Sequence, residues 1–139
     1  MSDNRVISIV DDEVDITTLF HEAICKIEGI SVKTFNDPLE ALEHFTTNPE
    51  PYVLVLSDNR MPELNGLDLL RRVKILKPYV RTVLMSAFDL EDDDVLEKYL
   101  EDGIVNKFIR KPIRISALCD EVNNQLHHYE LLQTGNKNK

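Results

Sequence analysis

The sequence of 139 residues lacks several features that mark membrane, secreted or disulfide-bonded proteins. No apolar run approaches the roughly 20 residues that a membrane-spanning helix needs. The first residues, Met1–Arg5, are mostly polar and predict no secretory signal peptide. Cysteine is limited to Cys25 and Cys119, which have no close Cys-x-x-Cys spacing. We therefore expect two reduced thiols in a cytoplasmic protein.

Positive charge is also scarce, with 16 lysines and arginines against 25 aspartates and glutamates and a net charge of -9. A chain this acidic repels nucleic acid and anionic membranes, so neither is an expected partner. The hydrophobic fraction of 42% is ordinary for a globular protein, and the length suits one domain with a single core. We expect that domain to span residues 1–128, with a polar, disordered tail at 129–139 and no room for an effector domain.

Short apolar runs alternate with amphipathic segments five times along the chain. The runs are rich in β-branched residues and end in polar ones, which is typical of buried strands. The segments between them repeat apolar residues at helical spacing. This alternation predicts an α/β fold, a doubly wound parallel sheet of five strands with helices on both faces. The expected strands are Arg5–Val10, Ile30–Phe35, Val53–Leu56, Arg81–Ala87 and Gly103–Arg110, and the expected helices are Val14–Ile27, a helix capped by Asp37, Leu67–Leu76, a helix capped by Asp89, and Ile113–His128.

Acidic residues directly follow two of these strands. Asp11 and Asp12 follow the first strand, and Asp58 ends the central one. Met61-Pro62 disfavours helix behind Asp58, so this residue starts a loop at the sheet edge where open α/β sheets bind ligands. At about 5 Å and an effective dielectric near 20, each pair of carboxylates repels by roughly 3 kcal/mol. The cluster is therefore expected to bind a cation, and its all-oxygen ligands favour Mg²⁺.

Two more strand ends carry polar groups that suit the same edge. Ser86 ends the fourth strand with a hydroxyl, and Lys111 follows the fifth strand with an ammonium group. A metal, a carboxylate, a hydroxyl and a lysine around one point are the groups that phosphoryl transfer requires.

With these residues in place, the sequence resembles the receiver domain of two-component response regulators, in the stand-alone form of the chemotaxis regulators. The resemblance covers about residues 5–128 and implies a flavodoxin-like fold. It is carried by Asp11-Asp12, by Asp58 in the block Asp-Asn-Arg-Met-Pro-Glu-Leu-Asn-Gly, by Ser86-Ala87 and by Lys111-Pro112.

The resemblance implies that Asp58 is the phosphoacceptor. It would take a phosphoryl group from a sensor histidine kinase or a histidine phosphotransfer protein and form an acyl phosphate. Mg²⁺ would be bound directly by Asp12, by Asp58 and by the backbone carbonyl of Arg60, with Asp11 acting mainly through water. Glu13 is interpreted as an acid that favours the helix start, with metal binding as the alternative.

Lys111 is expected to pair with Asp58 and then with the phosphoryl oxygens, and in the family its bond to Pro112 is usually cis. Ser86 would donate a hydrogen bond to a phosphoryl oxygen, the alternative being a hydroxyl that faces solvent. The small side chain of Ala87 would leave the phosphoryl group room to enter.

Three further residues are expected to tune the switch. Phe108 stands where the family keeps a switching aromatic, often tyrosine, so any switching works through packing alone; a static core phenylalanine is the alternative. The resemblance implies that Arg60 and Phe88 flank the line along which water attacks the acyl phosphate, and neither carries a carboxylate or amide that could orient a water. Slow loss of the phosphoryl group is therefore expected, unless both side chains point to solvent.

The resemblance also implies an output surface on the fourth helix, fifth strand and fifth helix. We expect a downstream protein, or a second copy of the chain, to bind this surface after phosphorylation. The fourth helix is strongly acidic, and a merely solvated face is the alternative.

Two other functions stay open. The chain could be the receiver of a larger DNA-binding regulator, or a Mg²⁺-dependent phosphatase-like hydrolase. The hydrolase is disfavoured because Arg60 stands where such enzymes carry a second acid, and a guanidinium cannot act as acid or base near neutral pH. As a receiver, the protein would be no enzyme beyond catalysing its own phosphorylation and dephosphorylation.

Overall fold

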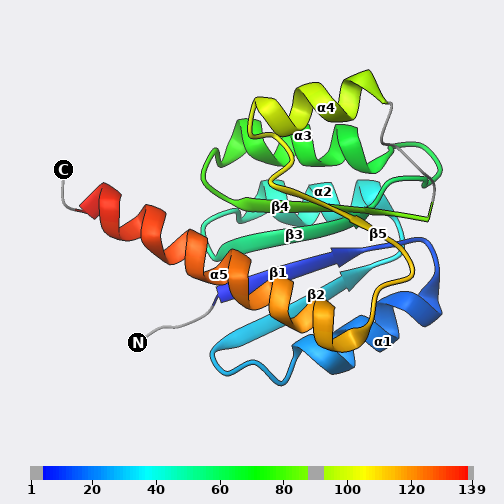
Figure 1. Cartoon of the computed structure of the whole chain (residues 1–139), viewed down its shortest axis with the longest axis horizontal. Coiled ribbons are helices and arrows are strands. Elements are labelled where there is room, and N and C mark those ends of the chain that lie inside the picture. The colour runs from blue at the N-terminus through cyan, green and yellow to red at the C-terminus, as the bar shows by residue number, and fades with distance from the viewer. Residues whose placement is uncertain (1–4, 88–92, 138–139) are drawn as a thin grey trace.

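The computed structural model describes residues 5–87 and 93–137, which form one sheet between two layers of helices (Figure 1). All strands are parallel, in the order β2-β1-β3-β4-β5, so the predicted doubly wound α/β fold is confirmed. The elements are β1 (Arg5–Val10), α1 (Val14–Ile24), β2 (Ile30–Phe35), α2 (Pro38–Thr47), β3 (Tyr52–Asp58), α3 (Gly66–Leu76), β4 (Arg81–Ser86), α4 (Asp94–Glu101), β5 (Lys107–Arg110) and α5 (Ile115–Lys137).

The sheet separates two apolar cores. Along β1, Val6 and Val10 face the core formed with α2, α3 and α4, whereas Ile7 and Ile9 face the core formed with α1 and α5. This alternation follows from the strand period of two, and each fully buried side chain of this size contributes about 2 kcal/mol. Among the described residues, no helix is both long enough and apolar enough to cross a membrane.

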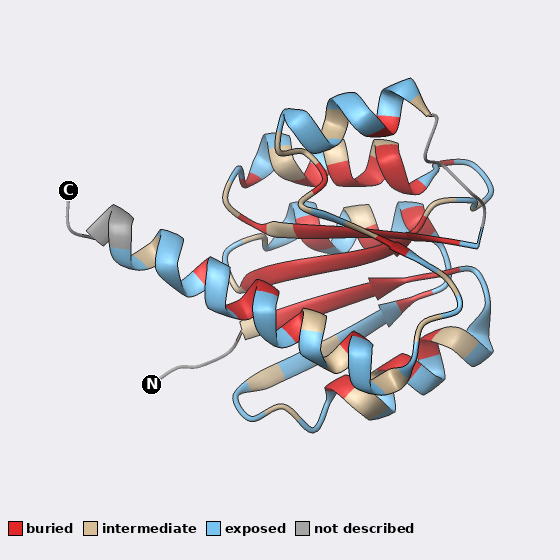
Figure 2. Cartoon of the chain, in the orientation of Figure 1, coloured by how far each residue is buried: buried red, intermediate tan, exposed pale blue. Residues whose placement is uncertain are grey.

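Helices cover the central strands on both faces, whereas the outer strand β2 is partly exposed. All residues of β3 are buried, whereas β2, at the edge of the sheet, exposes Ser31, Lys33 and Thr34 (Figure 2). Asp58 therefore ends a central strand that is shielded from water, and it lies at the carboxyl ends of the strands, where the predicted acids meet.

Side-chain caps determine where two helices begin. One begins at the predicted residue, and the other begins one residue earlier. The Asp37 carboxylate accepts the N–H of Leu39 at 2.9 Å, and Pro38 opens α2. The Asn65 side chain accepts the N–H of Asp68 at 2.8 Å and starts α3 one residue before the predicted position. Small polar side chains satisfy the free N–H groups of a first turn in this way.

The predicted start of α4 is wrong. The helix begins at Asp94, and its cap is Asp93, whose carboxylate accepts the N–H groups of Val95 and Leu96 at 2.9 and 3.1 Å. Asp89, the cap predicted from the sequence, lies outside the described residues. Several acids in a row each favour a helix start, so the sequence does not distinguish which one caps.

The strand predicted from Gly103 begins only at Lys107. Gly103, with φ of 77°, closes α4, and the N–H groups of Ile104 and Val105 then donate to the Tyr99 carbonyl at 2.9 and 3.1 Å. These bonds keep the segment in a turn, out of the sheet.

Helix α1 ends at Ile24, three residues earlier than predicted. The N–H of Ile27 donates to the carbonyl of Ile24 at 3.0 Å, a tighter turn than the α-helix makes, before Gly29 adopts φ of 79°. Other boundaries differ from the predicted ones by one or two residues.

The disordered tail predicted from residue 129 is wrong as far as residue 137, because α5 continues to Lys137 (Figure 1). Tyr129 is only 6% exposed and accepts a hydrogen bond from Gln133 at 2.7 Å. Arg5 forms an ion pair with Glu130 at 3.1 Å. These contacts hold a polar helix segment that has little apolar periodicity of its own.

Lys77, at the end of α3, anchors the same region. Its side chain is buried, and the ammonium group donates to three backbone carbonyls, of Pro49 at 3.3 Å, Glu50 at 2.7 Å and Tyr52 at 2.6 Å. These carbonyls belong to the segment that leads into β3. Burial lowers the pKa of Lys77 below its usual value, against the attraction of Glu50.

Two aromatic rings complete the surroundings of this ammonium. The Lys77 nitrogen lies 5.2 Å from the ring centres of both Tyr79 and Tyr129. Aromatic faces attract cations at this range. Lys77 thereby links α3, the entry to β3 and the second half of α5.

We predict that Lys77→Met lowers the free energy of unfolding by about 3 kcal/mol, because it leaves buried carbonyls without a donor. Urea denaturation measures the change, and amide exchange should rise in residues 129–134. Lys98→Met is the matched control, since Lys98 is exposed and forms a surface ion pair with Asp102 at 3.6 Å. Equal stability of the two variants would show that the buried ammonium does not anchor α5.

Candidate functional site

Two carboxylates and one ammonium meet at the carboxyl edge of the sheet. The Nζ of Lys111 lies 2.7 Å from Oδ2 of Asp11 and 3.1 Å from Oδ1 of Asp58. Asp11 is fully buried, and Asp58 is 9% exposed. The pairing predicted for Lys111 and Asp58 is therefore present, and Asp11 shares the same ammonium.

The strand register brings these groups together. Val10 pairs with Ser57 across β1 and β3, so the residues that follow them, Asp11 and Asp58, meet at one edge. Strand β4 carries Ser86 to the same edge, where it pairs with the last residue of β5. Parallel strands end side by side, and this rule correctly predicts that four groups lie at one edge: those of Asp11, Asp58, Ser86 and Lys111.

Three carboxylates are close enough to share a cation. Ligand oxygens of Asp11, Asp12 and Asp58 lie within 4.8 Å of one another. Both oxygens of Asp11 already accept hydrogen bonds, one from Lys111 and one from the N–H of Glu13 at 2.9 Å. Asp12, in contrast, is exposed. This all-oxygen donor set fits Mg²⁺, which takes few carboxylates and keeps several waters.

The electrostatics of the cluster are tightly coupled. Burial raises the pKa of Asp58, the hydrogen bond and charge of Lys111 oppose that change, and the charges of Asp11 and Asp12 add to it. Burial alone would lower the pKa of Lys111, but its hydrogen bonds to Asp11 and Asp58 hold it above the usual value. Lys111 is therefore the positive charge that balances these acids within the chain.

Gly66 lets the loop after Asp58 fold tightly over the strand end. A Cβ at this position would lie 2.3 Å from the Asp58 carbonyl oxygen and 2.7 Å from Cδ1 of Leu84. The N–H of Gly66 donates to the carbonyl of Asn59 at 2.9 Å, and the Asn59 side chain accepts the N–H of Leu67 at 3.2 Å. Only glycine permits so close an approach between α3 and β3.

The predicted phosphoryl-binding and switch residues lie around this cluster. Ser86 is buried, and its carbonyl accepts the N–H of Lys111 at 2.8 Å. Ala87 follows and is exposed. Phe108 is half-buried, pairs with Leu84 in register and packs against the core that α2, α3 and α4 cover. The switching role of Phe108 stays a prediction.

Arg60 has an exposed side chain two residues after Asp58. It lines a hollow of about 540 Å³ together with Asn59, Met61, Pro62 and Asn65. Phe88, its predicted partner in shielding the phosphoryl group, lies outside the described residues.

Two smaller expectations have a structural outcome. The bond between Lys111 and Pro112 is cis, as predicted. Glu13 is the N-cap residue of α1, while the carboxylates that meet are those of Asp11, Asp12 and Asp58. The interpretation of Glu13 as a helix-start residue agrees with this placement.

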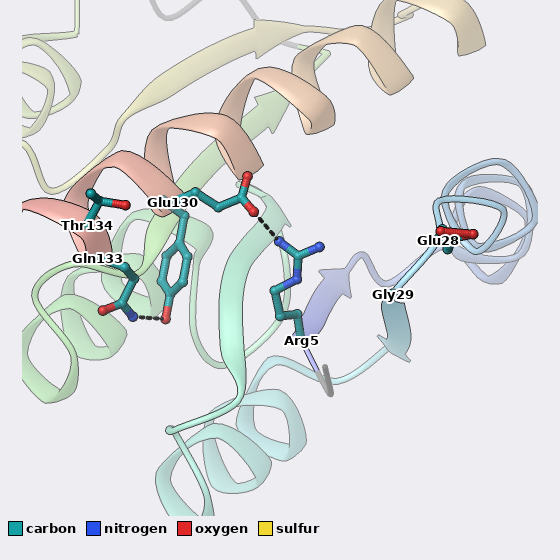
Figure 3. A pocket seen from close by; sticks show the side chains of 7 residues that line it. Arg5, Glu28, Gly29, Glu130, Gln133 and Thr134 are labelled. Carbon is teal, nitrogen blue, oxygen red and sulfur yellow. Dashed lines mark hydrogen bonds and ion pairs between the residues drawn. The ribbon is translucent and has the colours of Figure 1, made fainter. Parts of the chain in front are cut away.

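A second hollow, of about 600 Å³, lies at the opposite, amino edge of the sheet (Figure 3). Its charged side chains include Arg5 and Glu130, which are paired with each other. The strand-end acids are absent from its lining, so this hollow is separate from the candidate site.

Sequence reasoning missed two polar residues that support the acidic loop. The Nδ2 of Asn36 donates to the Asp11 carbonyl at 2.8 Å and to Oγ1 of Thr17 at 3.1 Å. Asn36 directly follows β2 at the same sheet edge as Asp11. The strand-end rule that selected the acids could have identified it, whereas Thr17 sits inside a helix and carries no such signal.

Comparison with known proteins agrees with this architecture. The family model of the response regulator receiver domain matches residues 7–123. The chain is 32% identical over 123 residues to sporulation initiation phosphotransferase F of Bacillus subtilis (strain 168), covering 88% of this chain and 94% of that protein. A response regulator receiver domain protein from Clostridium thermocellum superposes with a TM-score of 0.80 at 28% identity, covering 92% of this chain and 98% of that one.

Other relatives are much longer than this chain. It is 31% identical over 134 residues to the transcriptional regulatory protein CpxR homolog of Haemophilus influenzae (strain ATCC 51907 / DSM 11121 / KW20 / Rd), covering 89% of this chain and 56% of that protein. It is 33% identical over 122 residues to the DNA-binding transcriptional regulator NtrC of Klebsiella pneumoniae, covering 88% of this chain and 25% of that protein.

The fold and the site together define a doubly wound regulatory domain whose acidic edge fits Mg²⁺ and an aspartyl phosphate. The chain belongs to the receiver domain family of two-component response regulators. Members of this family interact with histidine kinases and with downstream targets.

We predict that Lys111→Met tightens Mg²⁺ binding by about tenfold, because the variant leaves Asp11 and Asp58 without the ammonium that pairs with them. A tenfold change in affinity corresponds to about 1.4 kcal/mol, which is a modest part of the ~4 kcal/mol interaction energy of two charges 4 Å apart at an effective dielectric of 20. Isothermal titration calorimetry measures the affinity. Lys107→Met, at an exposed lysine of β5, is the control and should bind as wild type does. Unchanged or weaker binding by Lys111→Met would contradict the balance of charges described above.

Proposed function

We propose that Asp58 is the phosphoacceptor of a two-component phosphorelay and that residues 5–128 act as a phosphorylation-controlled switch. The observation that carries this proposal is the position of the Asp58 carboxylate. It lies at the end of a buried central strand, 3.1 Å from a lysine ammonium and beside two further acids. A nucleophile, a counter-charge and a cation site then surround one point.

The proposed step is a transfer of the phosphoryl group from nitrogen to oxygen. A carboxylate oxygen of Asp58 attacks the phosphorus of a phosphohistidine on the partner. The phosphorus–oxygen bond forms as the phosphorus–nitrogen bond breaks, and the imidazole nitrogen keeps the electron pair. The product is an acyl phosphate on this chain and a free histidine on the partner.

The residues of the acidic edge would hold the metal during this step. Asp12, Asp58 and the backbone carbonyl of Arg60 would bind Mg²⁺ directly, and Asp11 would act through water. Mg²⁺, when bound, offsets the negative charge on the phosphoryl oxygens.

Lys111 and Ser86 bind the product in this scheme. Once Asp58 carries the phosphoryl group as an acyl phosphate, its carboxyl group loses its charge, so the Lys111 ammonium turns to the phosphoryl oxygens. The Ser86 hydroxyl donates a hydrogen bond to another of these oxygens, and the small side chain of Ala87 leaves room for the phosphoryl group. The resulting movement reaches Phe108, whose packing against the neighbouring core changes without a hydroxyl to hold it.

The output follows from the same change. The proposed surface comprises α4, β5 and α5. Helix α4 carries Asp94, Glu97 and Glu101, and β5 carries the basic residues Lys107 and Arg110. A histidine kinase or phosphotransfer protein loads the switch, and a downstream protein or a second copy of this chain reads it. The similarity to sporulation initiation phosphotransferase F supports a relay function of this kind. The proposed setting is cytoplasmic, and the only reactions catalysed are the chain's own phosphorylation and dephosphorylation.

A second candidate is the receiver of a longer regulator. It is favoured by the relatives that are transcriptional regulators, of which this chain spans 25% and 56%. The chemistry at Asp58 is the same in both cases, and the difference lies in what reads it.

We predict that Asp58→Asn abolishes phosphorylation, because an amide oxygen is a poor nucleophile. The protein is incubated with Mg²⁺ and a small-molecule phosphodonor, and intact-mass spectrometry measures the gain of one phosphoryl group. Asp15→Asn is the control, since Asp15 is an exposed acid of α1. A labelled peptide from wild type that excludes Asp58 would refute the assignment.

The same samples test the output. Phosphorylated wild type should sediment differently from Asp58→Asn, or should bind a kinase or target that the variant does not. Identical behaviour in both assays would leave the proposed surface without support.

We predict that Arg60→Asn/Phe88→Glu loses its phosphoryl group several-fold faster than wild type. Asparagine and glutamate can orient an attacking water, whereas in the proposed scheme the native arginine would pair with phosphoryl oxygens and the native phenylalanine would cover the approach. Decay is followed by mass spectrometry after the phosphodonor is removed. Arg72→Asn, at an exposed arginine of α3, is the control. Equal decay in all three proteins would mean that the two residues do not shield the group.

A further inference from the structure

We propose that Asn36 is a positioning residue for the acidic loop, through which the edge strand β2 sets the orientation of Asp12. This inference deepens the proposed function and rests on it. Asn36 is in contact with neither the metal nor the phosphoryl group in the proposed scheme. Its effect is exerted through the backbone of Asp11 and the first turn of α1.

Two hydrogen bonds from β2 fix the backbone of Asp11. Its N–H donates to the carbonyl of Phe35 at 3.1 Å, and its carbonyl accepts from Nδ2 of Asn36 at 2.8 Å. The first bond continues the pairing of β1 with β2, but the second needs an amide side chain at position 36. The peptide unit that joins Asp11 to Asp12 is therefore held by a side chain of another strand.

The same amide group also holds the helix that follows. Nδ2 of Asn36 donates to Oγ1 of Thr17 at 3.1 Å, and that hydroxyl donates to the carbonyl of Val14 at 3.1 Å. Thr17 is buried, so its hydroxyl has a fixed direction. Asn36 thus ties the end of β1 to the start of α1, and the segment between these two points is the one that carries Asp12.

Asp12 depends on this segment more than Asp11 does. The Asp11 side chain is fixed independently by Lys111 and by the N–H of Glu13. Within residues 5–87 and 93–137, the Asp12 carboxylate accepts no hydrogen bond, and it is exposed. The position of its Cα and the direction of its Cα–Cβ bond, which decide where the carboxylate can reach, are therefore set by the backbone. Hydrogen-bond partners that orient metal ligands without touching the metal typically change metal affinity by about 10- to 100-fold.

The test compares Mg²⁺ affinity with stability in wild type and four variants. Asn36→Leu removes both hydrogen bonds at similar volume and should weaken Mg²⁺ binding by about tenfold, the low end of that range because Asn36 is exposed. Thr17→Val removes one anchor of the amide and should weaken binding less. Thr17→Ser keeps the hydroxyl and should bind as wild type does. Isothermal titration calorimetry gives the affinity, and urea denaturation gives the stability of each protein.

Lys77→Met is the control for a merely structural effect, since Lys77 lies at the far end of α3 from the acids. It should lose stability without losing Mg²⁺ affinity. If Asn36→Leu does not fold, the pair Thr17→Val and Thr17→Ser carries the test.

Three outcomes decide the matter. Weaker binding in Asn36→Leu and Thr17→Val, with wild-type binding in Thr17→Ser and Lys77→Met, supports the positioning role. Wild-type affinity in both Asn36→Leu and Thr17→Val overturns it while the proposed function stands. If wild type itself neither binds Mg²⁺ nor takes a phosphoryl group at Asp58, the proposed function fails, and the inference about Asn36 fails with it.

Discussion

The repulsion among the carboxylates at one sheet edge is the constraint on which the rest of the structure depends. Three acids with oxygens within 4.8 Å of one another, two of them buried, cannot all stay charged without a cation. Lys111, the residue after β5, supplies that charge one hundred residues after Asp11 along the chain. The last strand must therefore lie in register beside β4, or the acids of β1 and β3 lose their partner. The site and the sheet topology require each other.

The sequence predicted the architecture well because strand and helix periods alternate clearly. It also predicted the edge at which the site lies, because parallel strands bring their carboxyl ends together. A single acid after a strand is often only a helix cap or a loop residue. Asp11, Asp58 and Lys111 could be selected because several charged strand ends were expected to meet at one edge. Even the helix capped by Asp37 could be read from local chemistry alone.

The errors fall where tertiary contacts outweigh local signals. The α4 start was misplaced among consecutive acids that are equivalent in sequence. The residues after Gly103 look like a strand, yet Tyr99 holds them in a turn. The end of α5 lacks apolar periodicity, and its contacts are tertiary ones, among them the buried ammonium of Lys77 beside the Tyr129 ring. Asn36 was missed because the search followed charge, while its contribution is a neutral hydrogen bond to the backbone.

The long α5 has a consequence for the ends of the described chain. Arg5, at the start of β1, and Thr134, near the end of α5, line the same hollow at the amino edge of the sheet (Figure 3). Both ends thus lie on the side of the molecule away from Asp58. This geometry suits circular permutation, in which a short linker joins the old ends and a surface loop supplies new ones. A fluorescent reporter attached at either end would likewise leave the acidic edge open to a partner.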